Sequence, residues 1–268
     1  MKKIIFVLAI SIPFFCAINI TQAIFEQKMV LPKSATFAAS LITIAKSFEG
    51  QPYKAATLEK SPEQLVCNLQ DFDCSTFVEN VLALTLTQKS ATKRFIGYQQ
   101  TLQKLRYHDA KIEGYASRLH YFLEWKIQAE KNKIVRDITA ELGGEKVEKT
   151  INFMSKHPAF YAALKDTLIL QKIKKNETIL NQSHWTYIPK DKVKSIESKM
   201  QNGDIVGVTS GIEGLDFNHQ GFVIFRNGRP HLLHASSEFK EIKISDEPLT
   251  DYLAKIKKHT GIVILRAI

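Results

Sequence analysis

The spacing of apolar residues changes along this 268-residue chain and divides it into a helical first part and a strand-rich last part. Apolar residues recur at helical intervals over residues 34–48, which predicts an amphipathic helix. Residues 74–88 have the same period but are apolar on almost every side, so we predict a helix that is buried nearly all round. The stretch from about 91 to 200 is typical of lysine-rich helices and too long for a loop. We interpret it as a mainly helical insertion in the same domain.

Beyond Asn202-Gly203 the pattern becomes that of short strands. Five segments are rich in β-branched residues and separated by turn residues, and they read DIVGVTS, HQGFVIF, HLLHASS, EIKIS and GIVILRAI. Helices first and an antiparallel sheet last predict an α+β fold. Residues 24–268 are enough for one hydrophobic core, so we expect them to form a single domain.

The chain begins with the features of a secretory signal peptide. Two lysines precede an uncharged apolar run over residues 4–20, and a processing site ending at Ala23 follows. A buried N-terminal helix or a membrane anchor is the alternative, but the run is short for a membrane span and Pro13 interrupts it. We predict that residues 1–23 are removed on export, that no stable membrane span remains, and that the protein is periplasmic.

The chain is basic, and this bears on its partners. Its formal net charge is +10 at pH 7, and loss of the two lysines in residues 1–23 would lower the charge to +8. A basic surface favours anionic partners, which outside the cytoplasm means cell-wall polymer or lipid head groups. A solvated lysine surface with no partner is the alternative. No nucleic-acid-binding motif occurs, and we expect no nucleic acid as a partner.

Cys74 is the main candidate for chemistry. Asp73 is suited to cap the predicted helix, which would put the sulfur of Cys74 in its first turn. There the exposed N–H groups and the helix dipole favour a thiolate, the nucleophilic form, and could stabilise the oxyanion of an attacked carbonyl. The alternative is a buried structural cysteine. Cys67 could form a disulfide with Cys74 in an oxidising compartment, but we interpret it as a small buried hydrophobe.

A predicted β-hairpin brings two histidines together. Asn227-Gly228 between two apolar runs is a strong turn signal. With these residues at the turn, the register makes His219 and His234 diagonal neighbours on one face, about 7 Å or less apart, and turns His231 to the other face. Together with Cys74 the pair would supply a nucleophile, a base and a group that orients the base.

Two other chemistries fit the sequence less well. A zinc site could use the histidines and Asp216, but His231 would face away and no His-Glu-x-x-His or Cys-x-x-Cys pattern occurs. A glycosidase needs two paired carboxylates, and nothing in the sequence pairs Glu79, Asp204 or Asp216 with one another. We expect no metal and no other cofactor.

Four strings in the chain, FDCSTFVENVLALTL, SRLHYFLEW, GLDFNHQGF and HLLHASS, carry a family resemblance. In this order they resemble the DUF1460 family, an N-acetylmuramoyl-L-alanine amidase-like branch of the NlpC/P60 superfamily, over about residues 50–266. The resemblance implies a papain-like NlpC/P60 fold in which the cysteine-bearing helix packs on an antiparallel sheet. It also implies a catalytic Cys-His-His arrangement, carried here onto Cys74, His219 and His234, with no cofactor.

The resemblance further implies an activity and a substrate. Enzymes of this branch cleave the amide between the lactyl group of N-acetylmuramic acid and L-alanine, so muropeptides or peptidoglycan fragments are the expected partners. Relatives elsewhere in the superfamily are γ-D-glutamyl endopeptidases, which is the first alternative, and a non-catalytic wall-binding protein is the second. In the implied chemistry Cys74 attacks the lactyl carbonyl, His219 is the acid–base and His234 orients it.

Substrate contacts are expected from side chains near these groups. The candidates are Tyr53 in QPYKAATLE, Arg118, His120 and Tyr121 in SRLHYFLEW, and Asp216 and Ser236 near the predicted histidine face. Arg118 would offer a bidentate partner for a carboxylate or a lactyl oxygen. The alternative makes Arg118 a structural ion pair and leaves Asp216 and Ser236 as residues that shape turns.

Overall fold

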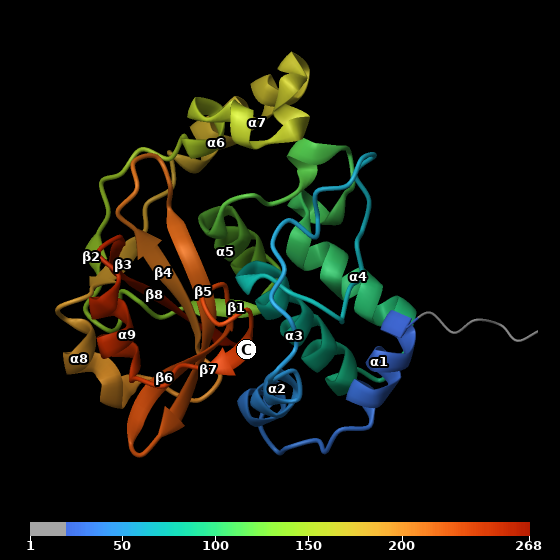
Figure 1. Cartoon of the computed structure of the whole chain (residues 1–268), viewed down its shortest axis with the longest axis vertical. Coiled ribbons are helices and arrows are strands. Elements are labelled where there is room, and N and C mark those ends of the chain that lie inside the picture. Colours follow the sequence, from blue (N-terminus) through green and yellow to red (C-terminus); the bar gives the residue numbers. More distant parts are fainter. Residues whose placement is uncertain (1–19) are drawn as a thin grey trace, which may run out of the picture.

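The computed structural model describes residues 20–268, which form one antiparallel sheet with helices on both of its faces (Figure 1). The strands are β1 (Val135–Asp137), β2 (Glu145–Lys146), β3 (Thr186–Pro189), β4 (Ile205–Ser210), β5 (Phe217–Arg226), β6 (Arg229–Ser236), β7 (Glu241–Ile244) and β8 (His259–Ala267). Their order is β2-β3-β8-β4-β5-β6-β7, with β1 also paired to β8. The predicted α+β class with an antiparallel sheet is confirmed.

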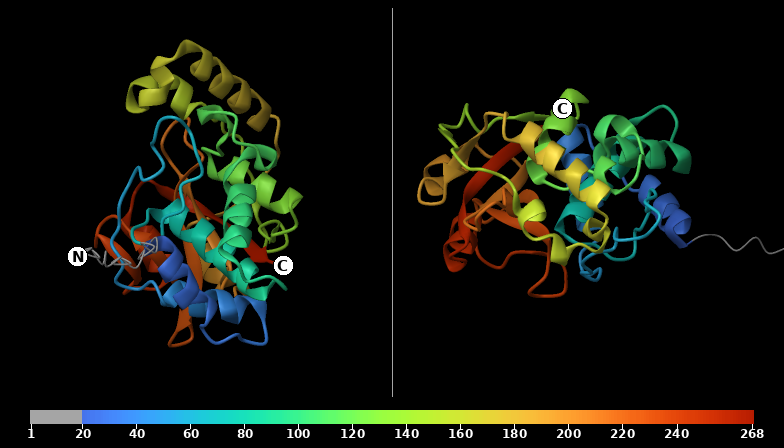
Figure 2. Two further views of the ribbon diagram at one scale, coloured as in Figure 1. Left: turned by 90° about the vertical axis from the view of Figure 1, so that its right-hand side faces the viewer. Right: turned by 90° about the horizontal axis from the view of Figure 1, so that it is seen from above.

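The helices gather in layers around this sheet (Figure 2). They are α1 (Ile20–Met29), α2 (Phe37–Lys46), α3 (Cys74–Lys89), α4 (Phe95–Arg106), α5 (Phe122–Lys131), α6 (Phe153–Lys156), α7 (Thr167–Leu180), α8 (Val193–Ile196) and α9 (Leu249–Lys255). The predicted signal segment 1–23 lies outside the described residues except for its last four, which belong to α1. Within residues 20–268 no helix has the length and hydrophobicity needed to cross a membrane.

Helix α3 is the centre of the larger core. Phe77, Leu82 and Ala83 point in different directions from the helix axis and are all fully buried, as the apolar pattern predicts. On the sheet side Phe77 packs edge-on against Phe222 of β5, with 5.7 Å between the ring centroids. Because apolar side chains surround α3 on nearly all sides, its first turn is held firmly relative to β5.

A second, smaller core lies on the opposite face of the sheet. There α8 and α9 cover side chains of β4, β5, β6 and β8, among them Val206, Val223 and Leu232. Strand β4 is buried at every position because it is covered on both faces. The sheet therefore separates two packed layers, and β5 contributes side chains to both.

The stretch from about 91 to 200 is more varied than its pattern predicts. It holds α4, α5 and α7, but also β1 and β3, which both pair with β8 and so extend the main sheet. These strands are only three and four residues long, too short for a clear period-two pattern. Arg118 and His120 precede α5 instead of lying within a helix.

Candidate active site

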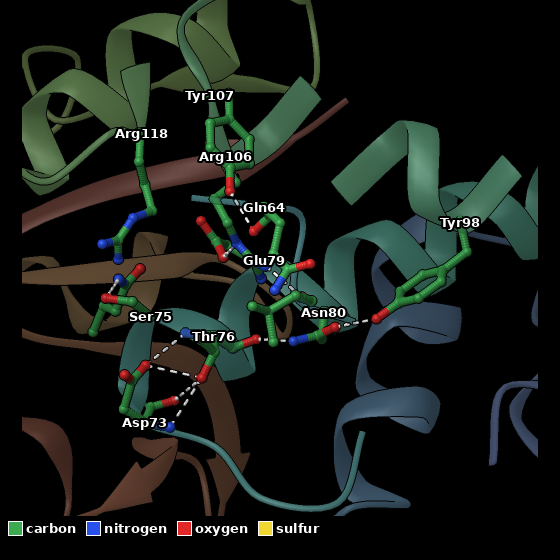
Figure 3. A network of polar contacts seen from close by, with 12 residues as sticks. Gln64, Asp73, Ser75, Thr76, Glu79, Asn80, Tyr98, Arg106, Tyr107 and Arg118 are labelled. Carbon is green, nitrogen blue, oxygen red and sulfur yellow. Dashed lines mark hydrogen bonds and ion pairs between the residues drawn. The ribbon is translucent and has the colours of Figure 1, made fainter. Parts of the chain in front are cut away.

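The helix start at Cys74 has the predicted cap. The Asp73 carboxylate accepts a hydrogen bond from the Thr76 backbone N–H at 2.8 Å, and the Thr76 hydroxyl accepts one from the Asp73 N–H at 2.9 Å (Figure 3). Cys74 is the first helical residue, as predicted, and its side chain is half-buried. Cys67 and Cys74 are both free, and Cys67 packs against the apolar core.

The β5–β6 hairpin has the predicted register. Asn227 and Gly228 form the turn with φ values of 50° and 77°, and Ile224 pairs with His231. The left-handed backbone explains the Asn-Gly sequence, because these residues adopt positive φ at low cost. His231 faces away from the histidine pair, and its Nδ1 hydrogen-bonds to the Ser245 carbonyl oxygen at 2.9 Å.

His219 and His234 meet as the register predicts. His219 Nε2 lies 2.6 Å from His234 Nδ1, and the rings are almost perpendicular. Gly221 leaves room for this contact, since a Cβ atom there would lie 2.7 Å from the Leu233 carbonyl oxygen and 3.0 Å from the His234 Cβ. The hydrogen bond uses Nε2 of His219, so Nδ1 is the ring nitrogen left for chemistry.

The sulfur of Cys74 lies against the strand that carries His219. It accepts a hydrogen bond from the backbone N–H of Gln220, the residue that follows His219, and others from the hydroxyl and backbone N–H of Ser75. Burial raises the pKa values of Tyr53 and Tyr252, and the charge of an ionised Cys74 would raise them further. Both phenols therefore lie in the neighbourhood of the sulfur.

Tyr252 was not a candidate in the sequence. It lies on α9, and its ring packs 5.4 Å from the ring of His234, 6.2 Å from His219 and 5.6 Å from His259. Helix α9 is a short element between two strands, and nothing in its pattern marks Tyr252 as part of a site. Tyr53, a predicted substrate contact, is half-buried and hydrogen-bonds through its backbone N–H to Lys240.

Burial governs the protonation of these groups. It raises the pKa of the Cys74 thiol to about 12, with the Asp73 charge adding to the effect and the three N–H and O–H donors opposing it. Burial, His234 and His259 hold the pKa of His219 well below its usual range, and burial lowers the pKa of His234 to about 4. The expected thiolate is therefore not the resting form at neutral pH, because burial outweighs the first-turn effect.

The neutral state defines what the histidine pair can do. With His219 carrying its proton on Nε2 and donating it to His234 Nδ1, the Nδ1 atom of His219 has a lone pair that can accept a proton. The same hydrogen bond would stabilise His219 once it is protonated. The arrangement can therefore act as a general base beside a neutral thiol.

A cavity of about 210 Å³ opens beside Ser75. Its walls include Arg118, His120 and Tyr121, three predicted substrate contacts, together with Glu59 and Arg106. Figure 3 shows Arg118 extending toward Ser75 across this region. The cavity wall thus collects polar side chains from a loop, α4 and the segment before α5.

The predicted contacts in this wall already have partners. Arg118 is buried, with Nη2 2.7 Å from Glu59 and Nε 3.3 Å from Glu63, which agrees with the ion-pair alternative. His120 Nε2 bonds to the Tyr115 carbonyl oxygen at 2.8 Å, and the Tyr121 hydroxyl donates to Glu177. Any role of these side chains in binding substrate has to be compatible with these contacts.

Two other predicted contacts, Asp216 and Ser236, hold the backbone in place. The Asp216 carboxylate is buried and accepts the backbone N–H groups of Leu123 and Phe217 at 2.8 and 2.7 Å, so it caps the start of α5. The Ser236 hydroxyl accepts the Phe239 N–H at 3.2 Å and shapes the turn before β7. These hydrogen bonds agree with the alternative in which both residues shape the chain locally.

A buried ion pair between Glu79 and Arg106 forms part of the cavity wall. Arg106 Nε lies 2.8 Å from Glu79 Oε2, and Arg106 Nη1 donates to the Val66 carbonyl oxygen (Figure 3). Both side chains are almost fully buried. Glu79 lies on α3, so this pair joins the cysteine-bearing helix to α4.

The family is shown by comparison with known proteins. Residues 43–262 match the AmiA-like family, described as N-acetylmuramoyl-L-alanine amidase-like. The chain belongs to this family. No curated protein matches it.

Solved structures with a similar fold match most of the chain. An N-acetylmuramoyl-L-alanine amidase from Bacteroides uniformis is 35% identical with a TM-score of 0.82, and the match covers 86% of this chain and 98% of that one. A Bacteroides fragilis protein described as a candidate xylanase is 36% identical, with a TM-score of 0.79 and coverages of 83% and 98%. A Legionella pneumophila protein of the DUF1460 family is 19% identical with a TM-score of 0.67 over 92% and 93%, which supports the fold.

Proposed function

We propose that this member of the AmiA-like family is an exported, cysteine-dependent N-acetylmuramoyl-L-alanine amidase that cleaves the lactyl–L-Ala amide of muropeptides. The observation that carries the proposal is a free cysteine at the start of α3. Its sulfur accepts a hydrogen bond from the backbone of β5 next to His219, and His219 hydrogen-bonds to His234. The amidase relative at 35% identity supports the bond type. The cysteine-bearing helix on an antiparallel sheet also supports kinship with papain-like NlpC/P60 proteins.

The proposed chemistry begins from the neutral pair. As the sulfur of Cys74 attacks the lactyl carbonyl carbon, His219 Nδ1 takes the thiol proton and His234 stabilises the resulting imidazolium. The carbonyl oxygen becomes an oxyanion near the first-turn N–H groups of α3. When the C–N bond breaks, His219 returns the proton to the departing alanine nitrogen and a thioester remains.

Hydrolysis of the thioester completes the cycle. His219, neutral again, removes a proton from a water molecule that attacks the same carbonyl carbon. The C–S bond breaks, the sulfur regains a proton and the lactic acid carboxylate leaves. The residues named here suffice for both half-reactions.

We propose the cavity beside Ser75 as the subsite for the peptide stem. It is lined by Asp73 and Ser75, the residues on either side of Cys74, and its walls carry both carboxylates and guanidinium groups, which suits a stem peptide that has amide N–H groups and carboxylates. Arg118, His120 and Tyr121 would then shape the cavity and bind through the donor and acceptor atoms that their partners leave free. Tyr53 would contact the substrate on the sulfur side.

Carboxylate chemistry is less well supported. A glycosidase needs an acid and a base or nucleophile that both face the substrate. In the structure Asp73 caps α3, Asp216 caps α5 and Glu79 is paired with Arg106. These three carboxylates are engaged in structural contacts, which favours the cysteine mechanism.

Product analysis on a defined muropeptide tests the proposal. We expect an N-acetylmuramoyl tripeptide to give the free sugar acid and an intact peptide that begins with L-Ala. A γ-D-glutamyl endopeptidase would leave L-Ala-D-Glu on the sugar, and a wall-binding protein would bind the muropeptide without cleaving it. Mass spectrometry separates these outcomes. Cys74→Ala should abolish cleavage, whereas Cys67→Ala, the matched control, should retain it.

Export is part of the proposal and has its own test. If residues 1–23 are a signal peptide, the protein recovered from the periplasm should begin at Ile24. Its intact mass should match residues 24–268. A periplasmic protein that retains Met1, or a protein confined to the cytoplasm, would contradict export.

A further inference from the structure

Gln220 occupies an unusual place between the two halves of the site. Its side chain is only 6% exposed, and its Nε2 donates a hydrogen bond to the Ser75 hydroxyl oxygen at 2.7 Å. The two residues directly follow His219 and Cys74 in sequence. The hydrogen bond therefore joins β5 to α3 at the point where the base and the sulfur are held.

The direction of this hydrogen bond decides what the Ser75 hydroxyl can do. Ser75 is exposed, so its hydroxyl would sample several staggered orientations without a fixed partner. Because its oxygen accepts from Gln220 Nε2, its own proton is directed elsewhere, and it donates to the Cys74 sulfur. The backbone N–H of Gln220 donates to the same sulfur.

We propose that Gln220 is a positioning residue that makes the Ser75 hydroxyl a fixed donor to the Cys74 sulfur, so that negative charge can develop on the sulfur during attack. The role of Gln220 in catalysis rests on the proposed function. Its effect on the sulfur does not, since the reactivity of the thiol can be measured without a substrate.

The sulfur needs such donors because its surroundings disfavour a charge. The Asp73 carboxylate, the phenols of Tyr53 and Tyr252 and the neutral ring of His219 face the Cys74 region from the loop before α3, α9 and β5. None of these groups carries a positive charge at neutral pH. Hydrogen-bond donors are thus the stabilising contacts for a thiolate until His219 is protonated.

The donor end of the Gln220 amide distinguishes this residue from a structural glutamine. Its Oε1 atom is buried and has no hydrogen-bond partner within residues 20–268, and the same is true of Oε1 of Gln88. The Nε2 atom of Gln220, however, donates to the Ser75 hydroxyl beside the sulfur. A site that requires a donor aimed at Ser75 accounts for this contact.

Alkylation of Cys74 by iodoacetamide at pH 9 tests the proposal, in a Cys67→Ala background so that one thiol reacts. We expect Gln220→Leu and Ser75→Ala each to lower the rate constant about tenfold. This factor corresponds to the free energy that a hydrogen bond to a charged group usually contributes. Gln220→Glu should lower it at least as much, because a carboxylate would accept the Ser75 proton and draw it away from the sulfur. In the Ser75→Ala background, Gln220→Leu should have little further effect.

Gln88 supplies the matched control. It is a fully buried glutamine near the end of α3, the helix that begins with Cys74. Its Nε2 donates to the Leu31 carbonyl oxygen. Gln88→Leu should lower Tm without changing the alkylation rate. If Gln220→Leu behaves in the same way, or if Gln220→Glu alkylates as fast as the parent, Gln220 is structural and the proposal is wrong.

The outcomes separate this inference from the proposed function. If the variants slow alkylation but the parent protein leaves muropeptides intact, the inference stands and the amidase proposal fails. If the parent cleaves muropeptides but alkylation is unchanged in the variants, only the inference fails. Where both hold, Gln220→Leu should lower kcat with little change in KM and should move the activity profile to higher pH.

Discussion

The site has a strand side, which is β5 and β6 with the histidine pair, and a cavity side, which is the wall of the cavity beside Ser75. On the strand side His219 and His234 hydrogen-bond to each other, whereas on the cavity side His120 hydrogen-bonds to the backbone carbonyl of Tyr115. Burial lowers the pKa of all three, for His120 to about 3. His219 differs in its surroundings, because the next residue, Gln220, donates its backbone N–H to the Cys74 sulfur. Similar burial and protonation therefore do not distinguish a reactive histidine from a structural one, whereas a nucleophile beside the ring does.

The same contrast holds for the charged side chains. Arg106 and Arg118 surround the cavity, but each is held by carboxylates, Arg106 by Glu79 and Arg118 by Glu59 and Glu63. The charged groups of the cavity wall thus pair with one another, while on the strand side the backbone N–H of Gln220 donates to the Cys74 sulfur. Substitutions of His219 and His234 should act mainly on kcat, whereas those in the cavity wall should act on stability and, more weakly, on KM.

Replacing the base should have the largest effect. We expect His219→Gln to lower kcat/KM about 10³- to 10⁴-fold, since it removes the proton acceptor, with little change in Tm. His120→Gln, the matched change in the wall, should keep kcat/KM within about tenfold. Steady-state kinetics on a defined muropeptide measures both. Equal losses in the two variants would contradict the division of the site into a reactive side and a supporting side.

Breaking the buried ion pair should come next. Arg106→Met would leave the Glu79 carboxylate buried without its partner, and we expect a loss of about 3–5 kcal/mol in the free energy of unfolding. The double variant Arg106→Met, Glu79→Gln should recover part of this loss, because no uncompensated charge remains. Urea denaturation gives the values. A double variant as unstable as the single one would contradict the ion-pair account.

Acid should weaken the fold through the buried histidines. His120 has a pKa of about 3 when folded, against an ordinary value of 6.5, so the unfolded chain binds more protons between these values. Stability is therefore full above about pH 6.5 and falls as the pH drops toward 3. We expect His120→Gln to remove roughly 1–3 kcal/mol of this acid-dependent loss. The free energy of unfolding measured at pH 7 and pH 4.5 tests it, and an unchanged difference would count against the lowered pKa.

The cap on α5 should give the smallest effect. Burial raises the pKa of Asp216 to about 7, although the two backbone N–H groups oppose this. Because the carboxyl has the higher pKa in the fold, its charge lowers stability as the pH rises from about 4 to about 7. Asp216→Asn keeps an acceptor and removes this charge, so we expect stability at pH 8 to be unchanged or higher, while Asp216→Ala should cost about 1–2 kcal/mol. Thermal unfolding separates the two, and activity should survive in both if Asp216 has no part in the chemistry.

The sequence by itself determined the local parts of the site. Asp73 caps α3 because its side chain reaches the N–H three residues on, and the Asn227-Gly228 turn fixes the hairpin register that pairs His219 with His234. Caps, turns and strand alternation depend on neighbours a few residues apart, so they can be derived without coordinates.

The tertiary structure decided which groups are buried and which distant partners they meet. Asp216 caps a helix start 93 positions away in the chain, Arg118 meets Glu59, and Tyr252 arrives from a helix with no distinctive pattern. The protonation of Cys74 follows from burial, which overrides the helix start that favours a thiolate. Contacts across long stretches of chain and the loss of water around a charge are properties of the packed fold, and no local pattern encodes them.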